Sequence, residues 1–152
     1  MRGTLLALAG IAVATSACGN SAAQPAHHTR QTPKPPEAYL TARGVRAKMA
    51  TGSSCWTIMH GRSGSTACSD SVGWSRYPGL PRVAIHPGDR VVVSFGFAPT
   101  RPIEVDYGGH SRYIPASAHP TLTVPGSGIL EVDAHGSQGD VSYGIRIVPG
   151  SS

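Results

Sequence analysis

The fold is decided by residues 83–97, which read VAIHPGDRVVVSFGF. Apolar and polar side chains alternate on both sides of the central Pro-Gly-Asp, and a period of two is typical of β-strands with one buried face. Pro87 presets φ for a turn, and Gly88 accepts the positive φ that follows in a type II geometry. We therefore expect two strands, Arg82–His86 and Arg90–Phe97, separated by a tight turn.

The same alternation recurs through the chain from about residue 51. Further strands are expected at Cys55–His60, Pro102–Tyr107, Thr121–Val124, Gly128–His135 and Asp140–Val148. Their apolar faces should form the core, with Val91, Val93, Phe95, Phe97, Ile103, Val105, Tyr107, Leu122, Val124, Leu130, Val132, Ala134, Val141, Tyr143, Ile145 and Ile147 inside. Seven or eight short strands in about 100 residues indicate an all-β fold, a small antiparallel β-sandwich of immunoglobulin-like type. A small closed barrel is the alternative.

The start of the chain has the features of an export signal. Met1-Arg2 is followed by an apolar run from Leu5 to Ala14 and then by small residues up to Cys18. A charged start, an apolar run and a small-residue cleavage site are the three parts of such a signal. The run has about half of the ~20 apolar residues that a membrane-spanning helix needs. Residues 1–17 are therefore predicted to be a signal peptide rather than an anchor.

Residues 16–18, Ser-Ala-Cys, resemble the lipobox of bacterial membrane lipoproteins, in which small residues precede an obligatory cysteine. This resemblance implies that Cys18 receives a diacylglyceryl group and fatty acyl chains such as palmitate, and that signal peptidase II cuts before it. The mature chain would be held at the outer face of the cell membrane. Thr15 departs from the family pattern, which prefers Leu, Val or Ile there. The alternative is an ordinary secreted protein cut after Ala14 or Ala17.

The chain has three cysteines, and exported proteins rarely keep a free reactive thiol. Lipidation of Cys18 leaves Cys55 and Cys68, which we expect to form a disulfide in an oxidising compartment, with a stabilisation of about 3 kcal/mol. Two buried free thiols are the alternative. The disulfide would join the ends of a loop at residues 60–66, whose small polar side chains do not pack.

The net charge of +5 is concentrated in a predicted disordered tether, residues 18–50. This segment has five basic residues against one acidic residue, whereas the expected β domain, residues 51–152, has seven of each. The domain is therefore neutral by this division, and nucleic acid is not an expected partner. Four prolines between residues 24 and 36 favour an extended chain. Its basic residues would lie near anionic lipid headgroups, or would simply keep a solvated linker extended.

The sequence lacks the motifs that are typical of metal binding and of hydrolase catalysis. The seven histidines occur in no His-x-His or His-Glu-x-x-His, no Cys-x-x-Cys is present, and neither Cys nor Met follows Cys68, as a copper site would need. Asp133 and His135 share a strand face and suggest a hydrolase triad, but no Gly-x-Ser-x-Gly occurs. We assign no metal, no cofactor and no catalytic residue.

Aromatic side chains provide the candidates for contact with a partner, because such side chains concentrate binding energy at interfaces. Trp56 is expected in the core, next to the disulfide. Trp74, Arg76 and Tyr77 lie in residues 69–81, which have weak periodicity and form a long loop. Long loops are uncommon unless they are functional or mobile. These three residues are the predicted contact site.

Three functions are compatible with these features. The first is a cell-envelope lipoprotein, of actinomycete type by its composition, whose β-sandwich is a non-catalytic binding module for an envelope protein or a glycan. The second is an envelope enzyme, such as a hydrolase, or a metal carrier. The third is a purely structural envelope module. The lack of catalytic and metal-binding motifs favours the first.

Overall fold

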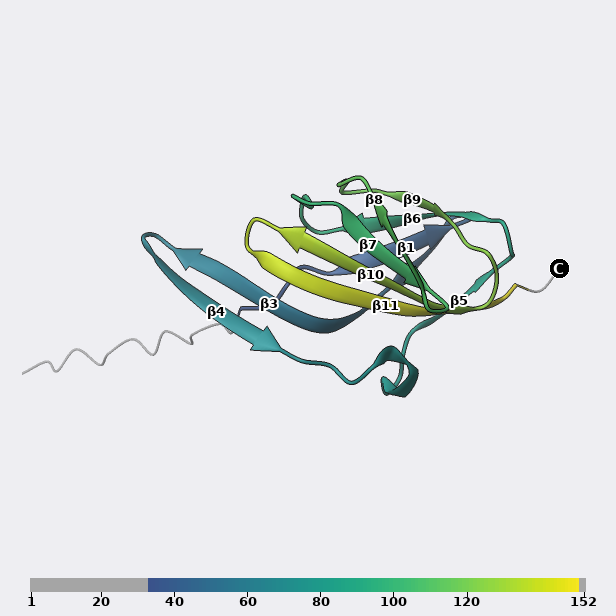
Figure 1. Ribbon diagram of the computed structural model, residues 1–152, viewed down its shortest axis with the longest axis horizontal. Coiled ribbons are helices and arrows are strands. Elements are labelled where there is room, and N and C mark those ends of the chain that lie inside the picture. Colours follow the sequence, from purple (N-terminus) through teal and green to yellow (C-terminus); the bar gives the residue numbers. More distant parts are fainter. Residues whose placement is uncertain (1–32, 151–152) are drawn as a thin grey trace, which may run out of the picture. The chain divides into compact units, whose positions relative to one another are not determined.

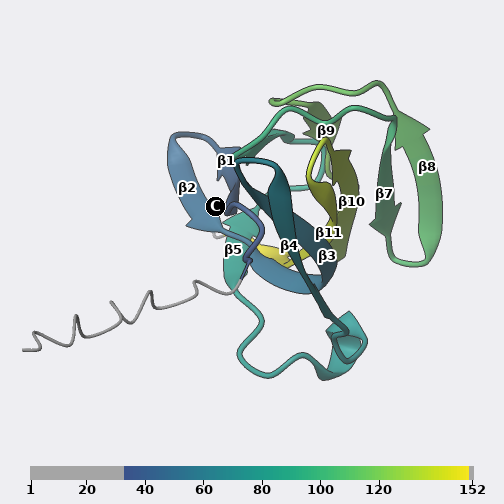
Figure 2. The same cartoon turned by 90° about the vertical axis from the view of Figure 1, so that its left-hand side faces the viewer.

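The computed structural model describes residues 33–150, which form two β-sheets with a shared core (Figures 1 and 2). The strands are β1 (Ala38–Ala42), β2 (Val45–Lys48), β3 (Ala50–His60), β4 (Ser63–Ser69), β5 (Arg82–Ile85), β6 (Arg90–Phe95), β7 (Ile103–Tyr107), β8 (His110–Ile114), β9 (Thr121–Thr123), β10 (Gly128–Gly136) and β11 (Gly139–Pro149). A 3-10 turn, η1 (Trp74–Arg76), lies between β4 and β5. The prediction of an all-β sandwich is confirmed, with more strands than expected.

The smaller sheet has the strand order β2-β1-β6-β9, and the larger has the order β4-β3-β11-β10-β7-β8. In the larger sheet β5 also pairs with β11 and is its one parallel neighbour, whereas all other described pairs are antiparallel. The long hairpin of β3 and β4 extends beyond the ends of the other strands (Figure 1). Figure 2 views the molecule from that end.

The core between the sheets consists of the side chains that the alternating pattern selects. Val91, Val93 and Phe95 of β6 face the buried residues of β10 and β11, and Tyr143 is the largest fully buried side chain. Phe97 and Tyr107 are only partly buried and pack against this cluster. The predicted inward faces of β6, β7, β9, β10 and β11 are therefore confirmed.

The turn at Pro87-Gly88 has the predicted geometry but a different consequence. Gly88 has φ +84°, and the amide of Asp89 donates to the carbonyl of His86 at 3.1 Å, as expected for a type II turn. However, β5 pairs with β11 in the larger sheet and β6 pairs with β1 and β9 in the smaller one. The turn therefore takes the chain from one sheet to the other and does not form a hairpin.

The β domain begins before residue 51. β1 and β2 lie in the segment that the sequence assigns to the tether, and Leu40 is completely buried. β1 pairs with β6 on one side and with β2 on the other, so it is an interior strand. The prediction of a tether that continues to residue 50 is therefore wrong, because every second residue of β1 is buried in the core.

This earlier boundary changes the charge of the domain. Arg43, Arg46 and Lys48 belong to the smaller sheet or its first turn, not to a tether. Residues 33–150 have eleven basic and eight acidic side chains, a net charge of +3. The expectation of a neutral β domain is therefore wrong, and its excess positive charge comes from residues 34–48.

Hairpins with two-residue turns account for the strands that the sequence did not indicate. In the β3–β4 hairpin the central residues are Gly61, with φ +64°, and Arg62; a glycine at the first position is typical of a type II′ turn. The β7–β8 hairpin turns at Gly108-Gly109, where both φ values are positive. Residues 60–66 are thus the last residue of β3, the turn and the first four residues of β4, and the prediction of a loop there is wrong.

The predicted signal peptide and residues 18–32 of the predicted tether, which include Cys18, lie outside the described residues. Their assignments stay predictions. Within residues 33–150, no helix has the length and apolar character needed to cross a membrane.

Candidate functional site

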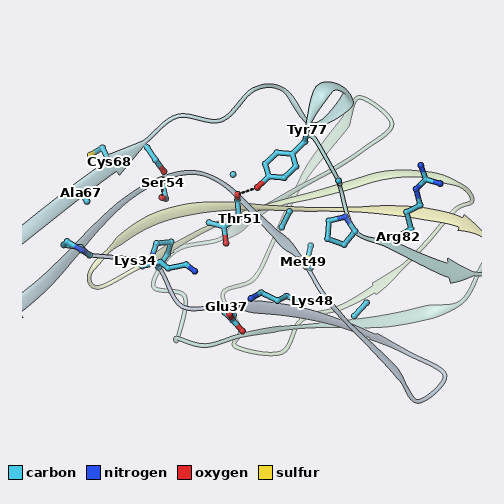
Figure 3. A pocket seen from close by; sticks show the side chains of 18 residues that line it. Lys34, Glu37, Lys48, Met49, Thr51, Ser54, Ala67, Cys68, Tyr77 and Arg82 are labelled. Atoms are coloured by element: carbon cyan, nitrogen blue, oxygen red, sulfur yellow. Dashed lines mark hydrogen bonds and ion pairs between the residues drawn. The ribbon is translucent and has the colours of Figure 1, made fainter. Parts of the chain in front are cut away.

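The candidate site lies where two strands share one edge of β11. β3 pairs with the first half of β11, up to Gly144, and β5 pairs with its last residues, Arg146–Pro149. Between β2 and β3 the chain changes sheets at Met49, whose amide donates to the carbonyl of Ala38 at 2.9 Å. This change of sheet leaves a groove of about 920 Å³, shown in Figure 3.

Apolar and hydroxyl groups form much of the groove. Met49, Ala50 and Pro81 contribute apolar surface, and Met49 is almost completely buried beneath it. Ser54 and Ser69, which come from adjacent strands, face each other with their Oγ atoms 3.1 Å apart. The groove therefore combines apolar patches with polar atoms that already have partners.

Tyr77 forms part of one wall of the groove. Its hydroxyl donates to the main-chain carbonyl of Thr51 at 2.9 Å, as Figure 3 shows. Its ring lies 5.2 Å, centroid to centroid, from the ring of Trp74. These two contacts fix the loop after η1 against β3, so that half-buried Tyr77 lines the groove from that side.

The N-terminal part of the described chain contributes to the groove and is held by the core. Pro33, Lys34, Pro35 and Glu37 all line it. The hydroxyl of the buried Tyr143 donates to the carbonyl of Pro36 at 2.5 Å. A core residue of β11 thereby determines the course of the chain beside the groove.

Three cationic side chains line the groove: Lys34, Lys48 and Arg82. Figure 3 shows Lys34 near the end with Ser54 and Cys68, and Arg82 toward the other end. Lys48 forms a salt bridge with Glu37, and this hydrogen bond lowers the pKa of the Glu37 carboxyl. Lys34 and Arg82 have no salt-bridge partner among residues 33–150.

Of the predicted contact residues, Trp74 is buried rather than exposed. Only 8% of its surface is accessible. Its ring covers the outer face of the larger sheet above Gly52 and Gly144, where an added Cβ would lie 2.6 Å and 2.4 Å from ring carbons. The exposure of Trp74, which the sequence left open, is thus decided by two glycines that make room for its ring on the sheet, and its predicted contact with a partner is not supported by this burial. Arg76 is exposed and does not line the groove.

The disulfide between Cys55 and Cys68 is present and joins directly opposite residues of β3 and β4. Trp56, the next residue, is 2% exposed and packs edge-on against Phe97, with ring centroids 5.1 Å apart. Its predicted place in the core beside the disulfide is confirmed.

Carboxylates gather on the outer face of the larger sheet. Asp133 lies opposite Glu104, and Glu131 lies opposite Asp106, in the register of β10 and β7. Partial burial and these neighbouring negative charges raise the pKa of Asp133 to about 6. No hydrogen bond joins Asp133 to His135 in the described part of the chain, so the triad geometry considered from the sequence does not form there.

Residues 33–150 contain no evident metal site and have a second cavity. No three His, Cys, Asp or Glu side chains in this range are placed to hold a metal ion. A second, mostly apolar cavity of about 290 Å³ has residues of β7, β8 and β9 in its lining, among them Tyr107 and Arg112. The hydroxyl of Tyr107 donates to the carbonyl of Gly126 beside it.

Sequence reasoning identified one residue of the groove, Tyr77, through its place in an irregular loop. It missed Lys34, Lys48 and Arg82 as a group, since these residues come from three separate segments. Comparisons with protein-family models, with curated proteins and with solved structures find no match to this chain. The geometry of the groove is therefore the basis on which a function is assigned.

Proposed function

We propose that this chain is an exported, lipid-anchored protein of the cell envelope, and that its β-sandwich binds an acidic peptide segment of another envelope protein in the groove. The observation that carries this proposal is the charge of the groove. Its lining has three cations and a single carboxylate, Glu37, which is already paired with Lys48. Lys34 and Arg82 are thus the groups to which carboxylates of a ligand would bind.

The chemistry of the lining favours a peptide over a glycan. Apolar surface from Met49, Ala50 and Pro81 suits aliphatic side chains placed between carboxylates. Glycan sites commonly offer aromatic rings as flat contact surfaces, but Tyr77 is the one aromatic residue that lines the groove, and its hydroxyl is bound to Thr51. An extended acidic peptide therefore fits the available groups best.

The lipid anchor is supported by the sequence around Cys18. Residues 16–18 resemble a lipobox, and the disulfide between the other two cysteines is the pairing expected after export. Twenty residue steps from Cys18 to Ala38 would place the domain within about 70 Å of the membrane surface. Mass spectrometry of the mature protein should find Cys18 acylated; an unacylated residue 18 would contradict the anchor but not the groove.

The other two interpretations predict different results. An enzyme or a metal carrier should be labelled by a serine-directed probe or contain a metal by elemental analysis. A purely structural module should bind no peptide in the groove. We favour binding because Lys34 and Arg82 line the groove without a salt-bridge partner among residues 33–150.

Fluorescence anisotropy with labelled hexaglutamate tests the proposal. The chain would be exported with Cys18→Ser, so that no lipid or free thiol is present at residue 18. Replacing Lys34 and Arg82 together by Ala should raise the Kd about tenfold, because each exposed ion pair contributes up to ~1 kcal/mol. A hexamer of galacturonic acid should bind more weakly than the peptide.

The matched control replaces Arg62 and Arg90, two exposed arginines that do not line the groove, by Ala. This pair changes the net charge equally and should leave the Kd within about twofold. An equal loss of affinity in both double variants would show non-specific charge attraction and contradict the groove. Tighter binding of the galacturonic acid hexamer would contradict the peptide and indicate a glycan.

A further inference from the structure

The free edge of β4 differs from the other edges of the two sheets. The edge strands are β2, β9, β4, β8 and β5, and β5 has only four residues, among them Arg82. β2 has Arg46 and Lys48, β8 has Arg112, and β9 has only three residues. Charges and short length are two ways in which proteins protect an edge from pairing with another chain. β4 has seven residues, SGSTACS, with neither a charge nor a proline.

The register of the β3–β4 hairpin determines which main-chain groups face outward. Cys55 and Cys68 are directly opposite with Cα atoms 4.0 Å apart, the close spacing of a pair that does not exchange hydrogen bonds. Thr57 and Thr66, two residues along, are also a pair that does not exchange main-chain hydrogen bonds. In agreement, the amide of Thr57 donates away from β4, to the carbonyl of Gln138. Hence the N–H and C=O groups of Gly64, Thr66 and Cys68 point to the free edge.

These three residues are symmetric about Thr66. If a second β4 strand runs antiparallel along this edge with Thr66 opposite its own copy, Gly64 of each chain lies opposite Cys68 of the other. Each of the three facing pairs exchanges two hydrogen bonds, about six in total. Gly64 has no side chain where the disulfide of the second chain must be accommodated, and a facing pair of threonines is favourable in antiparallel sheets.

Two further observations favour a second copy as the occupant. β4 has no charge, so two copies meet without electrostatic repulsion. The β3–β4 hairpin projects beyond the ends of the other strands, so part of the free edge of β4 lies away from the rest of the sandwich (Figure 1). β4 is also mostly exposed among the described residues.

We infer that the protein forms a two-fold symmetric dimer through antiparallel pairing of β4 with β4, centred on Thr66. The interface is a strand-to-strand contact of small area, so the dimer is transient in dilute solution. Ala67, Cys68 and Ser69 of β4 also line the groove, but Lys34 and Arg82 lie outside β4, so the Lys34 and Arg82 variants should dimerise normally.

Charge exchange at Thr66 tests both the dimer and its register. Sedimentation equilibrium of the full chain, exported with Cys18→Ser, should show a monomer–dimer equilibrium. Thr66→Glu and Thr66→Lys should each weaken dimerisation at least tenfold, because like charges then face each other at the two-fold axis. An equimolar mixture of the two variants should restore dimers, since Glu then faces Lys.

Thr121→Glu is the matched control, because Thr121 is an exposed threonine on the edge strand β9. It should leave the monomer–dimer equilibrium unchanged. Near-ultraviolet circular dichroism should show native packing for all three variants. A monomer at every concentration up to about 1 mM, a dimer indifferent to both Thr66 variants, or a mixture that fails to restore dimers would each overturn the inference.

Discussion

β3 and β11 each have eleven residues and pair with each other, yet their side chains are buried to very different extents. In β11 the five consecutive residues Val141–Ile145 are buried, because the core covers one face and Trp74 packs on the other. β3 loses this cover near its end, where Met59 and His60 are exposed and pair only with β4. The burial of a strand thus depends on what covers its outer face rather than on its length. The groove lies beside β3, and the proposed dimer edge belongs to β4, which pairs with the exposed end of β3.

The strongest test of this comparison is Gly144→Ala. The new Cβ would lie 2.4 Å from Cε3 of Trp74 and 2.6 Å from Cδ2, so the indole must leave the sheet or the strand must shift. Overpacking of this kind should lower the free energy of unfolding by about 3 kcal/mol, measured by urea denaturation. Gly73→Ala is the control, because nothing lies within 4 Å of its added Cβ, and it should change stability by less than about 0.5 kcal/mol.

Trp74→Ala sharpens the same result through a double-mutant cycle. The substitution should itself cost about 3 kcal/mol. In that background Gly144→Ala should have little further effect, because the clashing ring is gone. Additive losses of unfolding free energy would mean that the ring of Trp74 does not cover the outer face of β11.

Removal of the disulfide tests the exposed hairpin of β3 and β4. Replacing Cys55 and Cys68 together by Ala should cost about 2 kcal/mol, less than for an open loop because the hairpin turn already brings the strands together. Amides of β4 that are bonded to β3 should exchange with solvent at least tenfold faster, while those of β10 and β11 keep their protection. Equal acceleration in β4, β10 and β11 would contradict a local role of the disulfide.

Tyr143→Phe tests the hydrogen bond that joins the buried strand β11 to the chain segment beside the groove. It removes the hydroxyl that donates to the carbonyl of Pro36 and should cost about 1 kcal/mol. Cleavage after Glu37 by a glutamate-specific protease should accelerate, because the chain beside the groove loses its attachment to the core. Unchanged cleavage after Glu37 would show that this contact does not hold the segment.

The smallest expected effect concerns Asp133, one of the carboxylates on the outer face of the larger sheet. Because the pKa of Asp133 is raised to about 6, the folded state binds its proton more tightly than the unfolded state does. This contribution to stability is fully present below about pH 4 and is lost as the pH rises through about 6. Asp133→Asn should therefore stabilise the protein at pH 7 by about 1 kcal/mol, allowing for screening by solvent, and by nothing at pH 4.

Denaturation curves at several pH values measure this difference. Asp70→Asn, which changes an exposed carboxylate outside the cluster, should have no comparable effect at either pH. A stabilisation by Asp133→Asn that is the same at pH 4 and pH 7 would contradict the role of ionisation.

With the exception of β1, the sequence predicts strands well where one face is buried and poorly where no face is buried. β6, β10 and β11 alternate apolar and polar residues because the core selects every second side chain. The edge strands β2, β4 and β8 are mostly exposed, so no alternation marks them. The only local indication of these strands is in their turns, because a glycine at positive φ in a two-residue connection is typical of hairpins.

The candidate site was less predictable, because its groups come together only in three dimensions. The burial of Trp74 depends on Gly52 and Gly144, from two different strands, being adjacent in the sheet. A glycine inside the apolar run of β11 was the one local sign of a close approach. Lys34 and Arg82 have no common motif, and the change of sheet at Met49 that brings their segments to one groove depends on long-range pairing.

Photo-crosslinking tests the central claim, binding in the groove, most directly. Hexaglutamate with one benzoylphenylalanine at its centre would be irradiated with the full chain, exported with Cys18→Ser, and the adducts located by peptide mass spectrometry. The account predicts adducts at residues 47–54 and 77–82, lost when Lys34 and Arg82 are replaced by Ala. Adducts concentrated at the cavity beside Tyr107 and Arg112, or spread over the surface and unaffected by the double variant, would contradict it.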